Sequence, residues 1–171
     1  MELTALESRR TLHETTVVDL SALLDEVATS ARASGAARGV RVELRAGDAA
    51  SVEGDAFLLR RALANLVDNA IDFSPRDGVV TLALQRRGRS VDAIVQDQGP
   101  GIPDYAEAKV FEKFYSLARP HSNKKSTGLG LSFVKEIAEL HHGRVSLKNA
   151  DGGGARATLS LPLADETPAP G

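Results

Sequence analysis

The sequence contains no cysteine and no tryptophan, and it has only four histidines. Without cysteine the chain can form no disulfide, no thiolate metal site and no cysteine nucleophile. The histidines do not have the spacing of a zinc site, because only His141 and His142 lie near each other. These two end an expected helix, where we expect a cationic or capping role.

Long apolar runs and an excess of one charge are also missing. No stretch approaches the roughly 18 consecutive apolar residues of a membrane-spanning helix, and the N-terminus does not resemble a signal peptide. The 21 Lys and Arg nearly balance the 23 Asp and Glu, so the sequence lacks the basic footprint of a nucleic-acid-binding protein. With 42% hydrophobic residues, the 171 residues suffice for one globular domain with a buried core.

Apolar periodicity, helix caps and turn residues predict both helices and strands. We expect helices at 19–35, 55–73 and 129–141, a short helix at 106–114, and strands at 15–18, 40–44, 50–53, 79–85, 91–97, 144–148 and 155–161. The strand at 40–44 is expected to pair with 50–53 across the Gly47-Asp48 turn. Because helices and strands do not alternate strictly, the predicted fold is a two-layer α/β sandwich, with a mixed, mostly antiparallel sheet covered by three helices.

Two amides on the second helix form the first candidate site. Asn65 and Asn69 lie one turn apart, on the same face as Arg61 and Asp72 and away from the apolar stripe. An amide oxygen is a hard, neutral ligand that suits Mg²⁺ when phosphate oxygens and waters complete the shell. Alternatively, both amides bond to the backbone or to solvent.

An acidic residue before two glycines forms the second candidate site. Asp97 ends an apolar strand and is followed by Gly99, Gly101 and Ile102. A carboxylate at this point can accept a hydrogen bond from an exocyclic amine, and the glycines allow the backbone to approach a planar ligand. The same residues also make an ordinary turn.

The third candidate site opens the last helix with the residues Thr127, Gly128, Leu129, Gly130 and Leu131. Glycines at a helix start present free N–H groups to an anion, and the helix dipole favours phosphate there, although a glycine-rich start also occurs without a ligand. The irregular stretch before it, from 99 to 128, is long enough to suggest a functional lid. This stretch holds four of the seven aromatic residues, between Tyr105 and Tyr115, a concentration typical of an anchor or an interaction surface.

These motifs, in this order, resemble the ATP-binding domain of sensor histidine kinases. The Asn65/Asn69 helix corresponds to the N box, 97–102 to the first glycine box, 111–115 to the F box and 128–131 to the second glycine box. The resemblance runs from about Val17 to Leu163. The amino-acid sequence is similar to that of CreC-type sensor kinases in three stretches, at 54–60, 69–75 and 112–117.

The resemblance implies the Bergerat ATP-binding fold, with ATP and Mg²⁺ as cofactors. Asn69 would ligate Mg²⁺, Asn65 would support the phosphates, and Asp97 would accept from the adenine amino group. The glycines at 99 and 101, with Ile102, would shape the floor of the adenine pocket, and Phe73 would flank the base. Lys113 would reach phosphate or a partner helix, and residues 127–131 would meet the phosphates beneath a lid spanning about 102–127.

One position departs from the family pattern. Many relatives carry Lys or Arg three residues beyond the second Asn, where this chain has Asp72. The cation needed near the phosphates must then come from elsewhere. The candidates we consider are Lys113, Arg119, Lys124 and Lys125.

Two alternative functions share this fold. In ATPases of the gyrase, Hsp90 and MutL type a glutamate stands where this chain has Asn65, and an amide cannot take a proton from water at neutral pH. A kinase needs no such base, because a partner helix supplies the histidine nucleophile. The other alternative is a degenerate nucleotide-binding module that acts only through interactions.

The resemblance also implies a domain organisation. We expect 1–13 to be the end of a dimerisation helix and connector, 14–163 the catalytic domain, and 164–171 a disordered tail. None of the four histidines fits the acceptor motif, so the phosphoacceptor would lie on a separate dimerisation domain. The expected partners are ATP or ADP, that domain and a response regulator. The full-length protein would be a homodimer in the bacterial inner membrane, with this domain in the cytoplasm.

Overall fold

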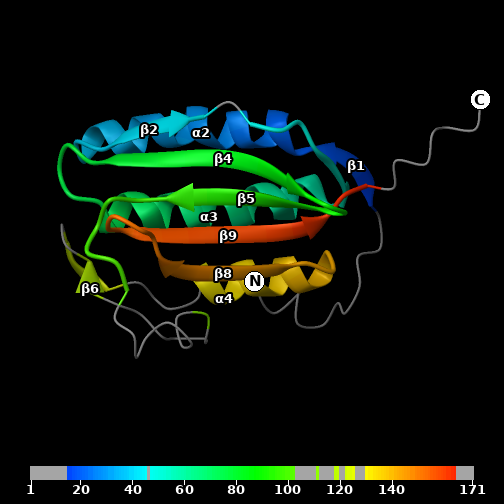
Figure 1. The fold of residues 1–171 in the computed structure, drawn as a ribbon. Coiled ribbons are helices and arrows are strands. Elements are labelled where there is room, and N and C mark those ends of the chain that lie inside the picture. Colours follow the sequence, from blue (N-terminus) through cyan, green and yellow to red (C-terminus); the bar gives the residue numbers. More distant parts are fainter. Residues whose placement is uncertain are drawn as a thin grey trace, which may run out of the picture.

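The computed structural model describes residues 15–45, 47–102, 111, 118–119, 122–125 and 130–164. Its main sheet has five strands in the order β2-β4-β5-β9-β8, with β2 parallel to β4 and all other pairs antiparallel. These strands are β2 (Arg41–Leu44), β4 (Val79–Arg87), β5 (Ser90–Gln96), β8 (Arg144–Asn149) and β9 (Ala155–Pro162). The helices α2 (Leu20–Ala37), α3 (Ala56–Phe73) and α4 (Gly130–Leu140) lie side by side behind it (Figure 1). The predicted two-layer sandwich is therefore confirmed.

Both long helices begin where their capping residues predict and α3 also ends there, whereas α2 continues past Gly35 to Ala37. The Asp19 carboxylate accepts from the backbone N–H groups of Ser21 and Ala22 at 2.9 and 3.3 Å, and Asp55 accepts from Leu58 at 3.1 Å. At the end of α3, the buried Ser74 hydroxyl donates to the Ala70 carbonyl at 2.9 Å, directly before Pro75. These side chains satisfy backbone groups that a helix end leaves without partners.

The expected pairing of 40–44 with 50–53 is wrong. The strand β3 (Ser51–Gly54) pairs instead with β1 (Thr16–Asp19), and β2 runs parallel to β4. After β2 the chain continues along β4 and does not turn back: Arg45 N–H donates to Leu82 O at 2.9 Å, and the Asp48 carboxylate accepts from Arg86 N–H at 2.8 Å. A local turn signal was thus outweighed by hydrogen bonds to a distant strand.

The core lies between the sheet and the helices. Its largest fully buried side chains come from both layers; they are Leu20, Leu24, Leu59, Leu63, Leu66, Ile71, Leu82, Ile137, Leu159 and Leu161. No described helix is both long and apolar enough to cross a bilayer. The remaining described strands, β6 (Ala118–Arg119) and β7 (Ser122–Lys125), pair with each other. The expected helix at 106–114 falls almost entirely outside the described residues.

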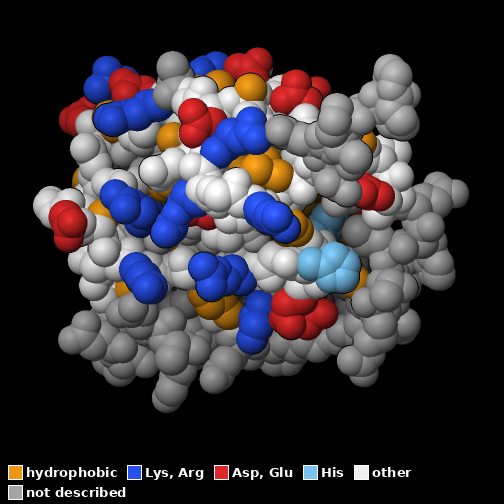
Figure 2. Space-filling model, turned by 45° about the vertical axis from the view of Figure 1, so that its right-hand side comes forward, with side chains coloured by type: hydrophobic (Ala, Val, Ile, Leu, Met, Phe, Trp, Pro, Cys, Tyr) orange, Lys and Arg blue, Asp and Glu red, His pale blue; other side chains and the backbone are white. Residues whose placement is uncertain are grey.

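The face of the main sheet opposite the helices is rich in Lys and Arg (Figure 2). Strand register places Arg87, Arg144, Lys148 and Arg156 on this face. Asp92 points the same way but is only 5% exposed, because its carboxylate is held by Arg87 Nη1 at 3.2 Å and by the Ser160 hydroxyl at 2.6 Å. The open face of the sheet therefore carries mainly positive charge, since the one carboxylate among these residues is paired with Arg87.

A buried histidine joins the end of α4 to the start of α3. His141 is 3% exposed; its Nε2 accepts from Asp55 N–H at 3.0 Å, which leaves Nδ1 to donate to Ile137 O at 2.7 Å. Burial lowers the pKa of His141 below its usual value and so disfavours the cationic role, whereas the bond from Nδ1 to Ile137 O in the last turn of α4 fits the expected capping role. Its neighbour His142 is exposed and adopts a φ of 60°.

We expect this histidine to make the fold sensitive to acid. A histidine that stays neutral when folded but takes a proton when unfolded contributes stability that is full above pH 6.5 and is lost as the pH falls through the lowered pKa. The loss should approach, at most, about 1.4 kcal/mol per pH unit for one proton. Urea unfolding at pH 7.5 and 5.5 should show a smaller difference in His141→Gln than in the wild type. His142→Gln is the control, and an equal effect of both variants would contradict the assignment.

Candidate nucleotide site

Asp97 anchors the candidate site at the end of β5. The residue is 5% exposed, and its Oδ1 accepts from the backbone N–H groups of Gly99 at 2.8 Å and Ala155 at 3.0 Å. Within the described part of the chain, its Oδ2 accepts no hydrogen bond. One carboxylate oxygen is therefore fixed by the backbone, and the other remains available for a donor on a ligand.

Burial raises the pKa of the Asp97 carboxyl, and the two backbone N–H groups oppose this shift. The N–H groups stabilise the ionised form, which accepts hydrogen bonds on both oxygens. The carboxylate is thus kept in a fixed orientation by bonds to two segments far apart in the sequence. Such a group can select for a ligand that offers a donor.

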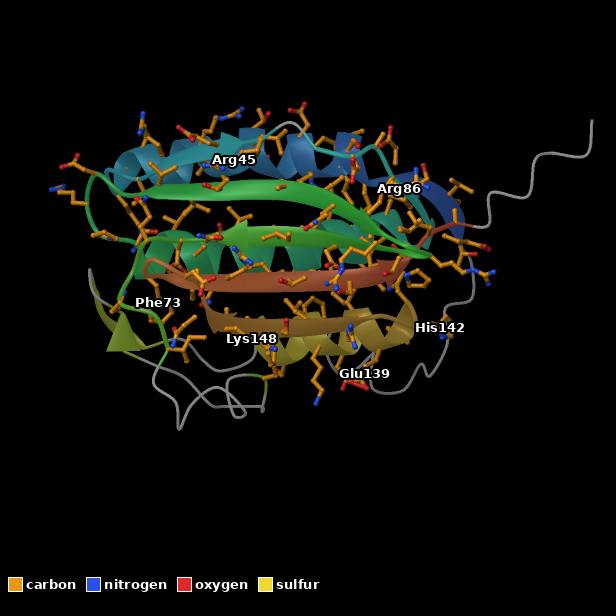
Figure 3. All side chains as sticks on the ribbon, viewed as in Figure 1. Arg45, Phe73, Arg86, Glu139, His142 and Lys148 are labelled. Carbon is orange, nitrogen blue, oxygen red and sulfur yellow. The ribbon has the colours of Figure 1, made fainter. Side chains whose placement is uncertain are left out.

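The backbone after Asp97 packs tightly on the end of α3. A Cβ on Gly99 would collide with the carbonyl oxygen of Phe73, which brings the aromatic residue and the first glycine box together. Phe73 is half-buried at the end of α3 (Figure 3). Gly101 has a φ of +84°, and a Cβ there would lie 2.5 Å from the Asn149 side-chain oxygen. Both glycines are therefore required by close approach, and Gly101 also by its backbone conformation.

Asn149 at the end of β8 is a site residue that the motifs did not indicate. Its amide nitrogen donates to Ile102 O at 3.0 Å, and its oxygen accepts from Ile102 N–H at 2.6 Å. The side chain therefore pairs with Ile102 as a neighbouring strand would. An asparagine before a glycine-rich turn was the only signal in the sequence. It does not reveal a contact 47 residues away.

The helix α3 presents its polar residues along one row. Arg61, Asn65, Asn69 and Phe73 follow one another at four-residue spacing. Asn65, Asn69 and Phe73 are half-buried, while Leu59, Leu63 and Leu66 are buried in the core. The two amides thus lie at the border between core and surface.

The aspartate that departs from the family pattern has a partner from another helix. Asp72 Oδ1 lies 3.0 Å from the Arg38 guanidinium, at the end of α2. The neighbouring Asp68 has a raised pKa because of burial and the Asp72 charge, which Arg38 partly offsets. The Asp72 side chain is therefore neutralised within the fold.

Two contacts define how α4 lies along α3. His141 after α4 bonds to Asp55 before α3, and the Phe133 ring of α4 lies 5.8 Å from the Arg61 guanidinium carbon. The helices therefore run antiparallel, which places Gly130 at about the level of Asn65. Leu131 is half-buried and packs against the core. The start of α4 thus faces the amide row.

Some expected site residues fall outside the described residues: Lys113, Thr127, Gly128 and Leu129. The side chains of Arg119, Lys124 and Lys125 are likewise not described. Of the aromatic cluster, Phe111 is described, and it packs against the core. The structure therefore brings together Phe73, Asp97, Gly99, Gly101 and Ile102, and aligns Asn65 and Asn69 with the start of α4.

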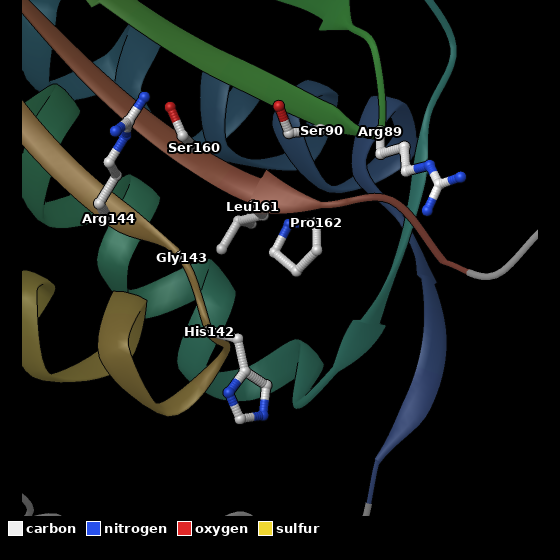
Figure 4. Close-up of a pocket in the computed structure, with 8 residues that line it drawn as sticks. All are labelled: Arg89, Ser90, His142, Gly143, Arg144, Ser160, Leu161 and Pro162. Carbon is white, nitrogen blue, oxygen red and sulfur yellow. The ribbon is translucent and has the colours of Figure 1, made fainter.

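A separate pocket of about 370 Å³ lies at the other end of the molecule. It is lined by Arg89, Ser90, His142, Gly143, Arg144, Ser160, Leu161 and Pro162. Arg89 and Arg144 lie on opposite sides of it, and their guanidinium groups do not turn toward each other (Figure 4). His142 and Phe73 lie at opposite ends of the fold (Figure 3). Because its polar groups do not converge, this pocket is a poorer ligand site than the region around Asp97.

Comparison with protein families matches residues 54–165 to the model described as "Histidine kinase-, DNA gyrase B-, and HSP90-like ATPase". The chain is 42% identical over 146 residues to the sensor protein CreC of Escherichia coli K12. The match covers 85% of this chain but 30% of CreC, so the chain spans about a third of that relative. This agrees with the similarity to CreC-type kinases seen in the sequence.

Two solved structures have the same fold as this chain. The mycobacterial sensor histidine kinase MprB superposes with a TM-score of 0.77 at 29% identity, over 88% of this chain and 99% of that one. The ATP binding domain of PrrB from Mycobacterium tuberculosis gives 0.70 at 31% identity, over 87% and 97%. The chain therefore belongs to the family of histidine kinase-, DNA gyrase B- and HSP90-like ATPases, and within it to the ATP-binding domains of sensor histidine kinases.

Proposed function

We propose that this chain binds Mg²⁺-ATP and transfers its γ-phosphate to a histidine on a separate dimerisation domain, for relay to a response regulator. The observation that carries the proposal is the buried Asp97, whose Oδ1 is held by two backbone N–H groups while Oδ2 remains available. A carboxylate oriented in this way suits a base with an exocyclic amino group. It therefore favours adenine over guanine.

Each site residue then has a role along the nucleotide. Asp97 accepts from the adenine amino group, Phe73 flanks the base, and the backbone from Gly99 to Ile102 forms the pocket floor. Asn65 supports the phosphates, and Lys113 contributes to phosphate binding or to contact with the acceptor helix. The stretch 127–131 meets the phosphates at the start of α4, where the helix dipole favours an anion.

The side chain of Asn69 fits a role as a magnesium ligand. Mg²⁺ in nucleotide sites takes few protein ligands and completes its octahedron with phosphate oxygens and water, so one amide oxygen from α3 is a suitable donor. When bound, the ion neutralises charge that develops on the transferred phosphoryl group. The protein supplies position: the rigid row on α3 fixes the amides relative to the base pocket.

The residue at position 65 favours a kinase over an ATPase. Asn65 lies one turn before Asn69, at the point where a hydrolytic enzyme of this fold places a carboxylate to activate water. An amide cannot act as that base, so water has no activating group there. A kinase needs only a correctly placed imidazole from its partner domain.

We further propose that the full-length protein is a homodimer anchored in the bacterial inner membrane, with this domain in the cytoplasm. In this arrangement 1–13 end the dimerisation helix and connector, 14–163 form the catalytic domain, and 164–171 are a tail. The support comes from the resemblance to sensor kinases whose length exceeds that of this chain.

Replacing Asp97 with Asn tests the adenine pocket without removing its support. The Asn oxygen can still accept from Gly99 and Ala155, but its amide then presents a donor to the donor on adenine. We expect ADP affinity to fall by about 10- to 150-fold, since a hydrogen bond to a charged group is worth about 1.5–3 kcal/mol. Calorimetric titration measures the loss, with Asp92→Asn on the open sheet face as the control. Unchanged ADP affinity in Asp97→Asn would remove Asp97 from the pocket.

Phosphotransfer is tested with labelled ATP and the chain's own dimerisation domain supplied in trans. We expect the wild type to label that domain on histidine, giving an acid-labile and alkali-stable product. Asn69→Ala should abolish labelling while changing metal-free ADP binding far less, because the amide acts at the phosphates. The chain alone should neither phosphorylate itself nor release phosphate quickly.

The same assay distinguishes the alternatives. Rapid phosphate release by the chain alone, without label on the partner, would establish an ATPase. If the chain binds no nucleotide, the remaining alternative is a module that acts only through interactions with other proteins. Asn65→Glu tests whether hydrolysis is slow because position 65 lacks a carboxylate to activate water. If so, this variant should release phosphate faster than the wild type.

A further inference from the structure

Arg61 occupies a defined place between α3 and α4. Arg60 and Arg61 are the cationic residues of α3. The Arg61 guanidinium carbon lies 6.0 Å from the centroid of the Phe57 ring and 5.8 Å from that of Phe133. Phe133 is 6% exposed, so this ring is fixed in the core. Contacts with two aromatic rings hold the guanidinium beside the first turn of α4.

The position of Arg61 along α3 continues the nucleotide row. Phe73, Asn69, Asn65 and Arg61 are separated by one helical turn each, a rise of about 6 Å per step. The base pocket lies at the Phe73 end, where Asp97 and Gly99 meet the helix. A nucleotide whose phosphates pass Asn69 and Asn65 therefore directs its terminal phosphate towards Arg61.

The charges on α3 explain why a cation is required at this end. Near the base pocket α3 carries Asp68 and Asp72, and Arg38 from α2 pairs with Asp72 at 3.0 Å. That end of the helix therefore offers no positive charge to a phosphate. The triphosphate keeps excess negative charge even beside a divalent ion. A guanidinium further along the same row can offset it in bidentate fashion.

We propose that Arg61 binds the terminal phosphate of ATP and replaces the cation that Asp72 does not supply. This inference rests on the proposed nucleotide site and adds a residue to it. Because Arg61 lies beyond Asn65, it contacts a phosphate that ATP has and ADP lacks. Arg61 therefore distinguishes substrate from product.

The test compares the binding of adenosine, ADP and a non-hydrolysable ATP analogue to the 171-residue chain with Mg²⁺ present. We expect Arg61→Gln to weaken binding of the ATP analogue by about tenfold or more, while ADP affinity stays within about twofold and adenosine binding is unchanged. Arg61→Lys keeps the charge but loses the planar fork, so its loss should be intermediate. Arg60→Gln, an exposed neighbour about 100° around the helix, is the matched control.

The outcomes separate this inference from the function on which it rests. An equal loss for the ATP analogue and ADP would overturn the assignment to the terminal phosphate, as would no loss for either nucleotide. If Arg60→Gln weakens binding of the ATP analogue as much as Arg61→Gln does, the loss reflects the net charge of the helix and not a specific contact of Arg61. If the wild type binds neither adenosine nor ADP, the nucleotide site itself is wrong. Circular dichroism melting of each variant shows whether the fold is retained.

Discussion

Helix α3 packs an apolar stripe into the core and presents a polar row to the candidate site, and the rest of the structure depends on this double role. Its apolar stripe, including Leu59, Leu63 and Leu66, is almost completely buried against the sheet and the other helices. Full burial of each such side chain contributes about 1.5–3 kcal/mol, so the helix cannot rotate without losing much of the core. Because the stripe fixes the rotation of α3, it also fixes the direction of the amides at the border between core and surface. The same residues that fold the domain therefore aim its polar row.

The strands and helices were largely predictable because their determinants are local. Asp19, Asp55 and the Ser74-Pro75 pair mark helix ends by bonding within a few residues of themselves. The pairing of β3 was not predictable in this way. It depends on hydrogen bonds that keep 45–48 alongside β4, and on β1, which lies more than 30 residues earlier in the chain. Local turn residues carry no information about such competitors.

The candidate site shows the same difference between residues that local motifs reveal and residues that only long-range contacts reveal. The residues around Asp97 and the two amides of α3 follow from motifs of short span, and in the structure Gly99 packs against the backbone of Phe73. The supports of these residues do not follow from motifs. Ala155 donates to Asp97 from a strand 58 residues away, and Asn149 holds Ile102 from the neighbouring strand. Arg61 belongs to the predicted row, but its importance appears only once Phe133 is seen against it.

The ion pair between Arg38 and Asp72 couples two positions that are otherwise independent in the sequence. The pair is half-exposed, so its contribution to stability is small, on the order of 0.2–1 kcal/mol. Its consequence for evolution is larger. Substituting lysine for Asp72 alone would place two cations at the end of α2 and leave Asp68 to balance both. The two positions are therefore coupled: a cation on α3 at this point is better tolerated when the residue at the end of α2 is not also a cation.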